Sequence, residues 1–153
     1  MATVYLDTSF VSACVSTRVD AKSVYRRETS LEWMGVQASR HQIYVSAEVL
    51  AELNSPSFPS RDAALGVVAS IPVLEVTGDA RRIAAAFIAE KVMPGPIGGD
   101  SLHVAVCCFN GVEYLLSWNV RHLANPNKAA HLQTICARLG LSAPRIVTPE
   151  LLW

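Results

Sequence analysis

The chain has 153 residues, of which 51% are hydrophobic and 17% are charged, and its 13 basic side chains balance its 13 acidic ones. This composition is typical of a globular protein with a substantial core, and we expect residues 1–153 to form a single domain. Because the formal net charge is zero, the chain lacks the long-range positive field of a general nucleic-acid-binding protein. Any such role must depend on a local site.

The cysteines and the N-terminus indicate an intracellular protein. Cys14, Cys107, Cys108 and Cys136 form neither a Cys-x-x-Cys pair nor a Cys/His cluster, so we interpret them as reduced thiols in a cytoplasmic protein. No basic segment precedes the first strand pattern, and no apolar stretch approaches the roughly 18 residues needed to cross a bilayer. We therefore expect neither secretion nor membrane insertion.

Short β-branched and aromatic runs alternate with helical patterns along the whole chain. Strands are expected at 3–6, 43–45, 73–76, 114–117 and 145–147, and helices just after residue 9 and at 21–40, 47–53, 61–70, 80–91, 100–110 and 128–139. Ser46, and either Thr77 or Asp79, are suited to cap the helices that follow them, and Thr148 before Pro149 marks a last helical start. This alternation predicts an α/β sandwich with a central, mostly parallel sheet of about five strands flanked by helices.

Ligands of such sheets bind at the carboxyl ends of the strands, and oxygen-bearing side chains are expected there. Asp7 ends the first strand, Glu48 and Glu52 share one face of the helix after the second strand, Asp100 begins the central helix, and Asn119 follows the fourth strand. Oxygen ligands from several element ends suit Mg²⁺ or Mn²⁺, and a converged cluster of carboxylates would repel without a cation. The spacing alone leaves open that these acids only cap helices.

Four further side chains have two interpretations each. Ser9 and Ser117 satisfy nearby backbone groups by default, but either hydroxyl could also support the site by reaching a carboxylate or a metal-bound water. Glu48 is either a helper ligand or a first-turn acid favoured by the helix dipole. His103, one turn beyond Asp100, is interpreted as a packed histidine rather than a ligand.

The ordered set of motifs resembles the PIN-domain nucleases, and most closely the VapC-type toxins of type II toxin–antitoxin pairs. Four segments correspond in order to the acidic motifs of that family: Val4–Ser9, Val45–Leu53, Gly99–Ala105 and Leu115–Leu123. The closing segment Ile146–Leu152 is also similar to the C-termini of many members. Each motif is short, but four in order, with the expected element between each pair, are specific to the family.

The resemblance implies a PIN-like α/β/α sandwich and a site in which Asp7, Glu52 and Asp100 hold Mg²⁺ or Mn²⁺ for hydrolysis of RNA phosphodiester bonds. Asn119 is then the fourth catalytic position, where many members have Asp. Asparagine keeps an oxygen ligand without the charge, so we expect weaker metal occupancy there. The implied partners are an RNA substrate, a small antitoxin whose tail blocks the acidic groove, and a second copy in a homodimer.

Two other classes of function compete with a nuclease. A PIN fold with a weakened fourth position would serve as a non-hydrolytic RNA- or protein-binding adaptor. An α/β phosphotransfer or phosphatase domain would use Asp7 as a covalent phosphate acceptor. A haloacid-dehalogenase-type enzyme would have a second Asp two residues later, where this chain has Ser9, and the acidic pair and late Lys of a receiver domain are missing.

Overall fold

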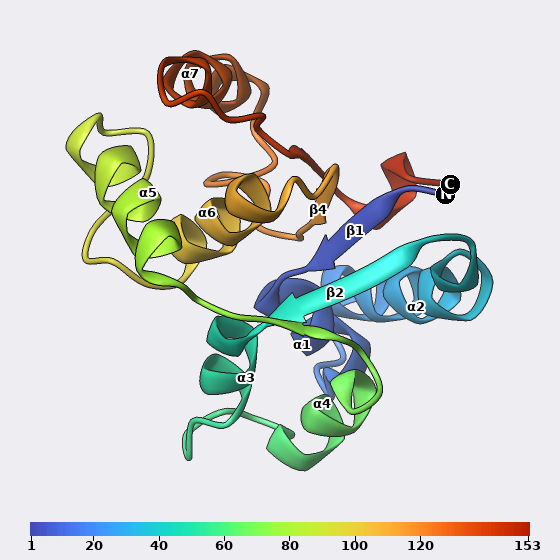
Figure 1. The fold of residues 1–153 in the computed structure, drawn as a ribbon. Coiled ribbons are helices and arrows are strands. Elements are labelled where there is room, and N and C mark those ends of the chain that lie inside the picture. The colour runs from blue at the N-terminus through green and yellow to red at the C-terminus, as the bar shows by residue number, and fades with distance from the viewer.

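The computed structural model describes residues 1–153 and contains a five-stranded sheet in which every strand pair is parallel (Figure 1). The strands lie in the order β3-β2-β1-β4-β5. Their bounds are Thr3–Leu6 (β1), Gln42–Ser46 (β2), Val73–Leu74 (β3), Tyr114–Leu116 (β4) and Arg145–Val147 (β5). The predicted α/β class and the parallel central sheet are confirmed.

Seven α-helices connect and cover these strands. They are Thr8–Val15 (α1), Ala21–Val36 (α2), Ala47–Leu53 (α3), Arg61–Val68 (α4), Gly78–Ala89 (α5), Asp100–Asn110 (α6) and Pro126–Arg138 (α7), with 3-10 turns at Ala38–Arg40 and Pro149–Leu151. The helix predicted over 21–40 ends earlier because the chain tightens into the first 3-10 turn before it enters β2. The third strand is shorter than predicted because it lies at the sheet edge and pairs with β2 alone.

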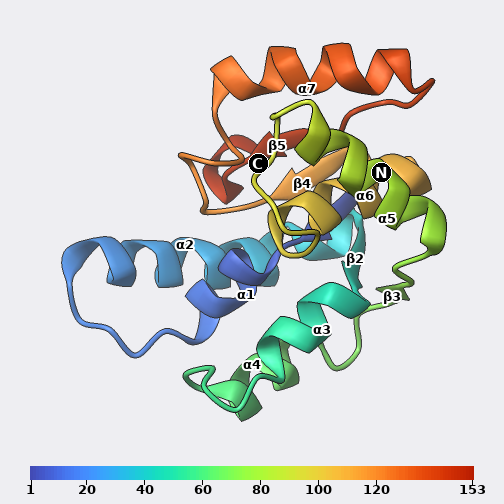
Figure 2. The same ribbon diagram turned by 90° about the vertical axis from the view of Figure 1, so that its left-hand side faces the viewer.

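The strand order fixes the side of the sheet on which each helix lies. The chain steps from β1 to β2 to β3 in one direction and then crosses back to β4 and β5 on the other side of β1. Because crossovers between parallel strands are right-handed, α1 to α4 cover one face and α5 to α7 cover the other. In agreement, α1 packs against α2, α3 and α4, whereas α5 packs against α6 (Figures 1 and 2).

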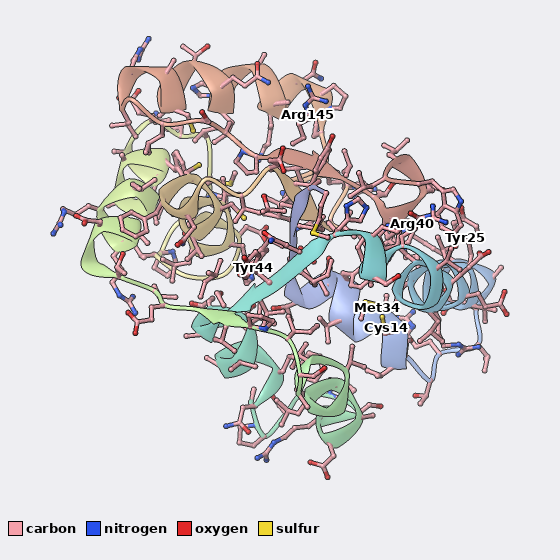
Figure 3. All side chains as sticks on the ribbon, turned by 45° about the vertical axis from the view of Figure 1, so that its right-hand side comes forward. Cys14, Tyr25, Met34, Arg40, Tyr44 and Arg145 are labelled. Atoms are coloured by element: carbon pink, nitrogen blue, oxygen red, sulfur yellow. The ribbon has the colours of Figure 1, made fainter.

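The core surrounds the two central strands. Val4, Tyr5 and Leu6 of β1 and Leu115 and Leu116 of β4 are fully buried, as expected for parallel strands covered on both faces. The helix α6 is buried from Ser101 to Cys108, which confirms its predicted central place. All four cysteines are free and buried, and Figure 3 labels Cys14 on α1 and Met34 on α2, a helix that packs against α1. None of the helices is long and apolar enough to cross a membrane.

Of the predicted helix caps, Thr77 makes the expected cap bond, whereas Ser46 and Thr148 do not. Ser46 precedes α3 but its hydroxyl makes no cap bond, because it lies 2.6 Å from the Tyr5 hydroxyl instead. Thr77, rather than Asp79, caps α5 by accepting a hydrogen bond from the Ala80 amide at 3.1 Å. Likewise Thr148 does not cap the last turn, since its hydroxyl donates to Glu150 at 3.2 Å.

The start of α6 has no side-chain cap. Gly99 occupies the cap position with a φ of 51°, a backbone conformation that favours glycine, and Asp100 is the first helical residue. The Asp100 carboxylate is therefore not used as a helix cap.

Candidate active site

The candidate site lies at the carboxyl edge of the sheet, where β1 and β4 end side by side. The Asp7 amide donates to the Leu116 carbonyl at 3.2 Å, which places the residues after both strands next to each other. From here the chain leaves β1 toward β2 on one side, while β4 continues to β5 on the other. Such a topological switch point is where open parallel sheets bind ligands.

Asp7 is both a helix cap and a candidate ligand. Its Oδ1 accepts hydrogen bonds from the Phe10 amide at 2.9 Å and from the Ser9 hydroxyl at 2.7 Å. The residue is only 2% exposed, and this burial raises the pKa of its carboxyl, although His103, Ser117 and Ser9 act in the opposite direction. The helix cap therefore explains why an Asp stands at this position. It does not offset the free-energy cost of burying the charge of the carboxylate.

The two predicted supporting serines connect Asp7 to the loop after β4. The hydroxyls of Ser9 and Ser117 lie 3.2 Å apart. The Trp118 amide donates to Ser9 and the Asn119 amide donates to Ser117, both at 2.9 Å. Each serine thus satisfies backbone groups, as expected by default, and also links two strand ends across the site.

Asn119 contacts Asp100 directly. The amide nitrogen of its side chain donates to Asp100 Oδ2 at 2.8 Å, so Asn119 is a hydrogen-bond donor to an acid of the site. Burial raises the pKa of Asp100, the His103 ring lowers it, and the negative charge of Glu52 raises it further. The net direction of the pKa is upward, because burial outweighs the lowering effects of His103, His122 and Lys128.

Glu52 is held by a chain of contacts that reaches into the core. Its Oε1 accepts a hydrogen bond from the Thr8 hydroxyl at 2.8 Å and lies 2.6 Å from Nε2 of His103. The other ring nitrogen of His103 lies 2.7 Å from the Tyr5 hydroxyl, which in turn contacts Ser46. Tyr5 and His103 are buried, whereas the Glu52 side chain is 35% exposed.

The electrostatics of this pair follow from its geometry. Burial raises the pKa of Glu52, but the hydrogen bonds from His103 and Thr8 outweigh burial and bring it below its ordinary value. Burial lowers the pKa of His103, but the bond to Glu52 and the charges of Asp7, Glu52 and Asp100 raise it above its ordinary value. The interpretation of His103 as a packed histidine is correct, and its ring also touches a predicted site residue.

The structure therefore brings most of the predicted residues to one place. One hydrogen-bonded network joins Asp7, Ser9, Ser117, Asn119 and Asp100, and a second joins Glu52 to Thr8, His103 and Tyr5. Glu48 lies in the first turn of α3 and makes no hydrogen bond or ion pair with either network.

The sequence interpretation assigned no role in the site to Thr8 or Tyr5. The adjacency of Thr8 to Asp7 is the one signal in the sequence that could have identified Thr8, just as the three-residue spacing from Asp100 drew attention to His103.

The donor set of the site suits a hard cation, but its side chains are not drawn together into a finished metal site. No three His, Cys, Asp or Glu side chains lie close enough together to hold a metal ion. The available donors are carboxylate and amide oxygens, the ligand types that Mg²⁺ and Mn²⁺ accept. Cys107 is fully buried, and burial with the Asp7 charge raises the pKa of its thiol, so no thiolate competes. The residues fit the predicted cation by their chemistry.

Comparison with known proteins gives similarity at the level of structure. No family model and no curated protein matches the sequence. The VapC20 toxin of Mycobacterium tuberculosis, which cleaves the sarcin-ricin loop, is similar with a TM-score of 0.61 and 20% identity over 84% of this chain and 95% of that one. VapBC2 of Rickettsia felis, bound to a DNA fragment from its promoter, is similar with a TM-score of 0.54 and 16% identity over 77% and 88% of the two chains. The chain therefore has the PIN-like α/β/α fold of VapC-type toxins.

Proposed function

We propose that this protein is a divalent-metal-dependent endoribonuclease. The observation that carries the proposal is the arrival of Asp7, Glu52, Asp100 and Asn119, from four separate segments of the chain, at the carboxyl edge of a VapC-like sheet. Burial raises the pKa of Asp7 and Asp100 by disfavouring their negative charge, and a bound cation would relieve that cost.

In this proposal Asp7, Glu52 and Asp100 hold Mg²⁺ or Mn²⁺. The bound cation supplies a water of lowered pKa and offsets the charge that develops on the phosphate. Ser9 and the start of α1 fix the Asp7 carboxylate, and Asn119 orients Asp100. Thr8 and His103 hold Glu52. Covalent phosphate transfer to Asp7 is disfavoured because Ser9 stands where a haloacid-dehalogenase-type enzyme would have its second Asp.

We also propose that the enzyme is the toxin of a toxin–antitoxin pair. The Rickettsia felis neighbour is a VapBC2 complex on promoter DNA, which supports a small antitoxin as the partner of this chain. The homodimer expected from the sequence stays a prediction, and analytical ultracentrifugation of the purified protein tests it.

The decisive experiment is RNA cleavage. The wild-type protein should cut single-stranded or looped RNA in Mn²⁺, and EDTA should stop the reaction. Asp7→Asn, Glu52→Gln and Asp100→Asn should each remove most of the activity, mainly through kcat, because these residues position the cation rather than the substrate. Asp62→Asn is the matched control, since it removes one carboxylate from the exposed start of α4.

One observation favours the adaptor as a second candidate. The acids do not form a compact three-ligand cluster, and Glu52 is engaged by His103. RNA that is bound but left intact across several metals and many sequences would support the adaptor and contradict the nuclease.

A further inference from the structure

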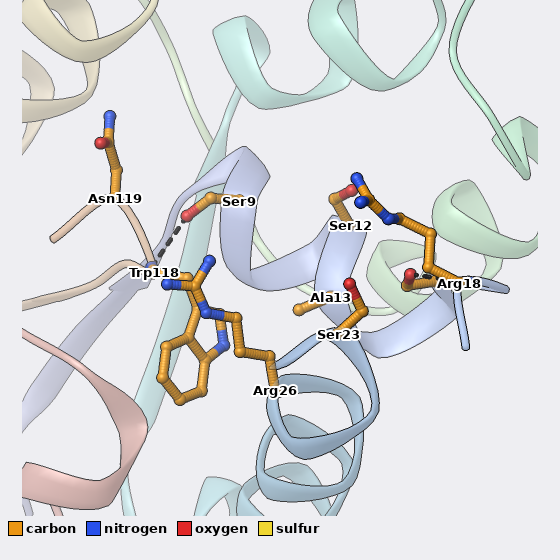
Figure 4. A pocket seen from close by; sticks show the side chains of 9 residues that line it. Ser9, Ser12, Ala13, Arg18, Ser23, Arg26, Trp118 and Asn119 are labelled. Carbon is orange, nitrogen blue, oxygen red and sulfur yellow. Dashed lines mark hydrogen bonds between the residues drawn. The ribbon is translucent and has the colours of Figure 1, made fainter. Parts of the chain in front are cut away.

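A polar groove opens beside the acidic site. It has a volume of about 400 Å³ and lies between α1, the first part of α2 and the loop after β4 (Figure 4). Four serine hydroxyls and two guanidinium groups line most of its wall, from Ser9, Ser12, Ser16, Ser23, Arg18 and Arg26. Hydroxyls and guanidinium groups without an acidic lining residue form a surface that suits an anionic ligand.

The groove is continuous with the candidate active site. Ser9 and Asn119 line one end of it, and the same two side chains donate hydrogen bonds to Asp7 and Asp100. Figure 4 shows Asn119 and Ser9 at one end and Arg18 at the other, with Arg26 beside the Trp118 ring near Ser9. A polymer seated in the groove would therefore run directly into the acidic site.

The spacing of the serines on α1 aligns them along the groove. Ser9, Ser12 and Ser16 are three and four residues apart, so they lie on one face of the helix and at its end. At about 1.5 Å of rise per residue, the row extends roughly 10 Å from the acidic site toward Arg18. Ser9 already donates to Asp7, but the hydroxyls of Ser12 and Ser16 remain free to donate. A row of polar groups of this length matches a strand with several acceptors better than it matches a single small anion.

Arg26 is held over the groove by the loop that carries Asn119. Its guanidinium lies 5.2 Å from the centre of the Trp118 ring, and the Trp118 indole nitrogen donates to Ser30 at 2.8 Å. Trp118 is only 5% exposed, and the Tyr25 ring meets it edge-on, so the aromatic platform is fixed. Arg26 has no carboxylate within ion-pair distance, which leaves its charge available to a ligand.

Arg18 supplies a second, weaker cation. It pairs with Asp20 at 3.2 Å, but both side chains are exposed, so a phosphate could compete for the guanidinium. The planar guanidinium of arginine matches phosphate oxygens in a two-point contact. Both arginines thus line the same groove as the serine hydroxyls, and neither forms an ion pair with Asp7, Glu52 or Asp100.

We propose that this groove binds the sugar-phosphate backbone of the RNA strand next to the phosphate that is cleaved, with Arg26 as its main phosphate contact. The inference rests on the proposed nuclease function, because it takes its direction from the acidic site. An acidic peptide is the competing occupant, but only a phosphodiester strand carries into the acidic site the bond that the proposed nuclease hydrolyses.

The test measures binding separately from cleavage. In an Asp100→Asn background, the affinity for a fluorescein-labelled single-stranded RNA is measured by anisotropy over a range of salt concentrations. Each lost phosphate contact lowers the slope of log affinity against log salt by about 0.7. Arg26→Gln should show that reduction and Arg26→Lys should largely retain the wild-type slope. Arg81→Gln, which removes one exposed charge from α5, should leave the slope unchanged.

Cleavage kinetics give a second measurement. In the otherwise wild-type protein, Arg26→Gln should raise KM by about tenfold with little change in kcat, because the contact is equally strong in the ground and transition states. Arg18→Gln should shift KM in the same direction by less. Arg18→Gln also keeps the proposal testable if Arg26→Gln does not fold, because Arg18 lies away from the Trp118 ring.

The outcomes separate the groove from the nuclease. If Arg26→Gln, Arg18→Gln and Arg81→Gln all have the same slope of log affinity against log salt, and the protein cleaves RNA, the proposal that the groove binds RNA is wrong and the proposed nuclease activity stands. Reduced slopes in a protein that never cleaves RNA would support RNA binding in the groove and contradict the proposed nuclease activity. Polyglutamate that displaces the RNA and binds with the same dependence on Arg26 would assign the groove to an acidic peptide instead.

Discussion

His103 and Glu52 face each other at 2.6 Å, although one lies on α6 and the other at the end of α3. The histidine ring is buried and is anchored behind by the Tyr5 hydroxyl at 2.7 Å, so the partly exposed carboxylate of Glu52 has a rigid support. A side chain that must hold a cation needs its rotamer fixed from behind by such contacts. The pair thus connects the packing of the core to the geometry of the site.

Removal of the ring should destabilise the protein. His103→Leu leaves the buried Tyr5 hydroxyl with one partner fewer, and it leaves Glu52 with the Thr8 hydroxyl as its one remaining donor. We expect a loss of about 1–3 kcal/mol in the free energy of unfolding, measured with urea. His131→Leu, at an exposed position of α7, is the control and should change the value by less than about 0.5 kcal/mol. An equally small change for His103→Leu would show that the contact does not support the fold.

The contribution of this pair should depend on pH in metal-free buffer. The pKa of His103 is raised above 6.5, so its contribution is fully present below 6.5 and is lost as the pH rises through the folded-state value. The pKa of Glu52 is lowered below 4.5, so its contribution is present above 4.5 and is lost as the pH falls through the folded-state value. The stability difference between wild type and His103→Leu should therefore be largest between these limits. A difference that stays constant up to alkaline pH would contradict the assignment.

Substitutions of Asp7 can separate its role as a helix cap from the effect of its buried charge on stability. Asp7→Asn keeps an oxygen for the Phe10 amide and the Ser9 hydroxyl but removes the buried charge, so the metal-free protein should become more stable at neutral pH. Because the folded pKa of Asp7 is raised, this gain should disappear at acidic pH, where the wild-type carboxyl is protonated. Asp7→Ala loses the cap as well and should be about 1 kcal/mol less stable than Asp7→Asn. Thermal melting in EDTA measures all three, and a wild type at least as stable as Asp7→Asn at neutral pH would contradict the prediction.

The sequence was sufficient to predict the elements and the acids because both depend on local patterns. The run from Thr3 to Leu6 is apolar and β-branched or aromatic, Asp7 follows it directly, and Gly99 marks the start of α6. Each of these features is determined by neighbours within a few residues, and each was found where it was expected.

The orientations within the site could not be predicted in the same way. Ser46 precedes a helix and was expected to cap it, but its hydroxyl meets Tyr5 from 41 residues away. Asn119 was expected to present its oxygen, but its amide nitrogen meets Asp100. Such contacts depend on how strands and helices are brought together in space, and a spacing rule along the chain contains no information about them.

Cation binding should stabilise the folded protein. Millimolar Mn²⁺ or Mg²⁺ should raise the melting temperature, and a cation at about 100 times its dissociation constant contributes roughly 2.7 kcal/mol. The double variant Asp7→Asn/Asp100→Asn should lose this response, whereas Asp62→Asn/Glu90→Gln, which removes two exposed carboxylates, should retain it. An equal thermal shift in all three proteins would mean that the cation binds elsewhere.

If Asp100 holds a cation as proposed, its contact with Asn119 should make substitutions at position 119 change the metal requirement. Asn119→Asp replaces the donor at 2.8 Å from Asp100 Oδ2 with a second carboxylate, so in EDTA the two acids should repel and the melting temperature should fall. In Mg²⁺ the added charge should instead tighten cation binding and move the requirement for activity to lower concentration. Asn119→Ala should raise that requirement and preserve the fold, because the residue lies on a partly exposed loop.

The size of these shifts should be modest, because charges at an accessible site act through a high effective dielectric and are screened by salt. Activity titrated against Mg²⁺, with melting curves in EDTA, compares the three proteins. Superimposable activity titrations would mean that Asn119 has no effect on metal binding. Its hydrogen bond to Asp100 would then contribute only to the structure of the protein. Loss of folding in Asn119→Ala would assign the residue a structural role, because a loop side chain that only adjusts metal affinity can be removed without unfolding the domain.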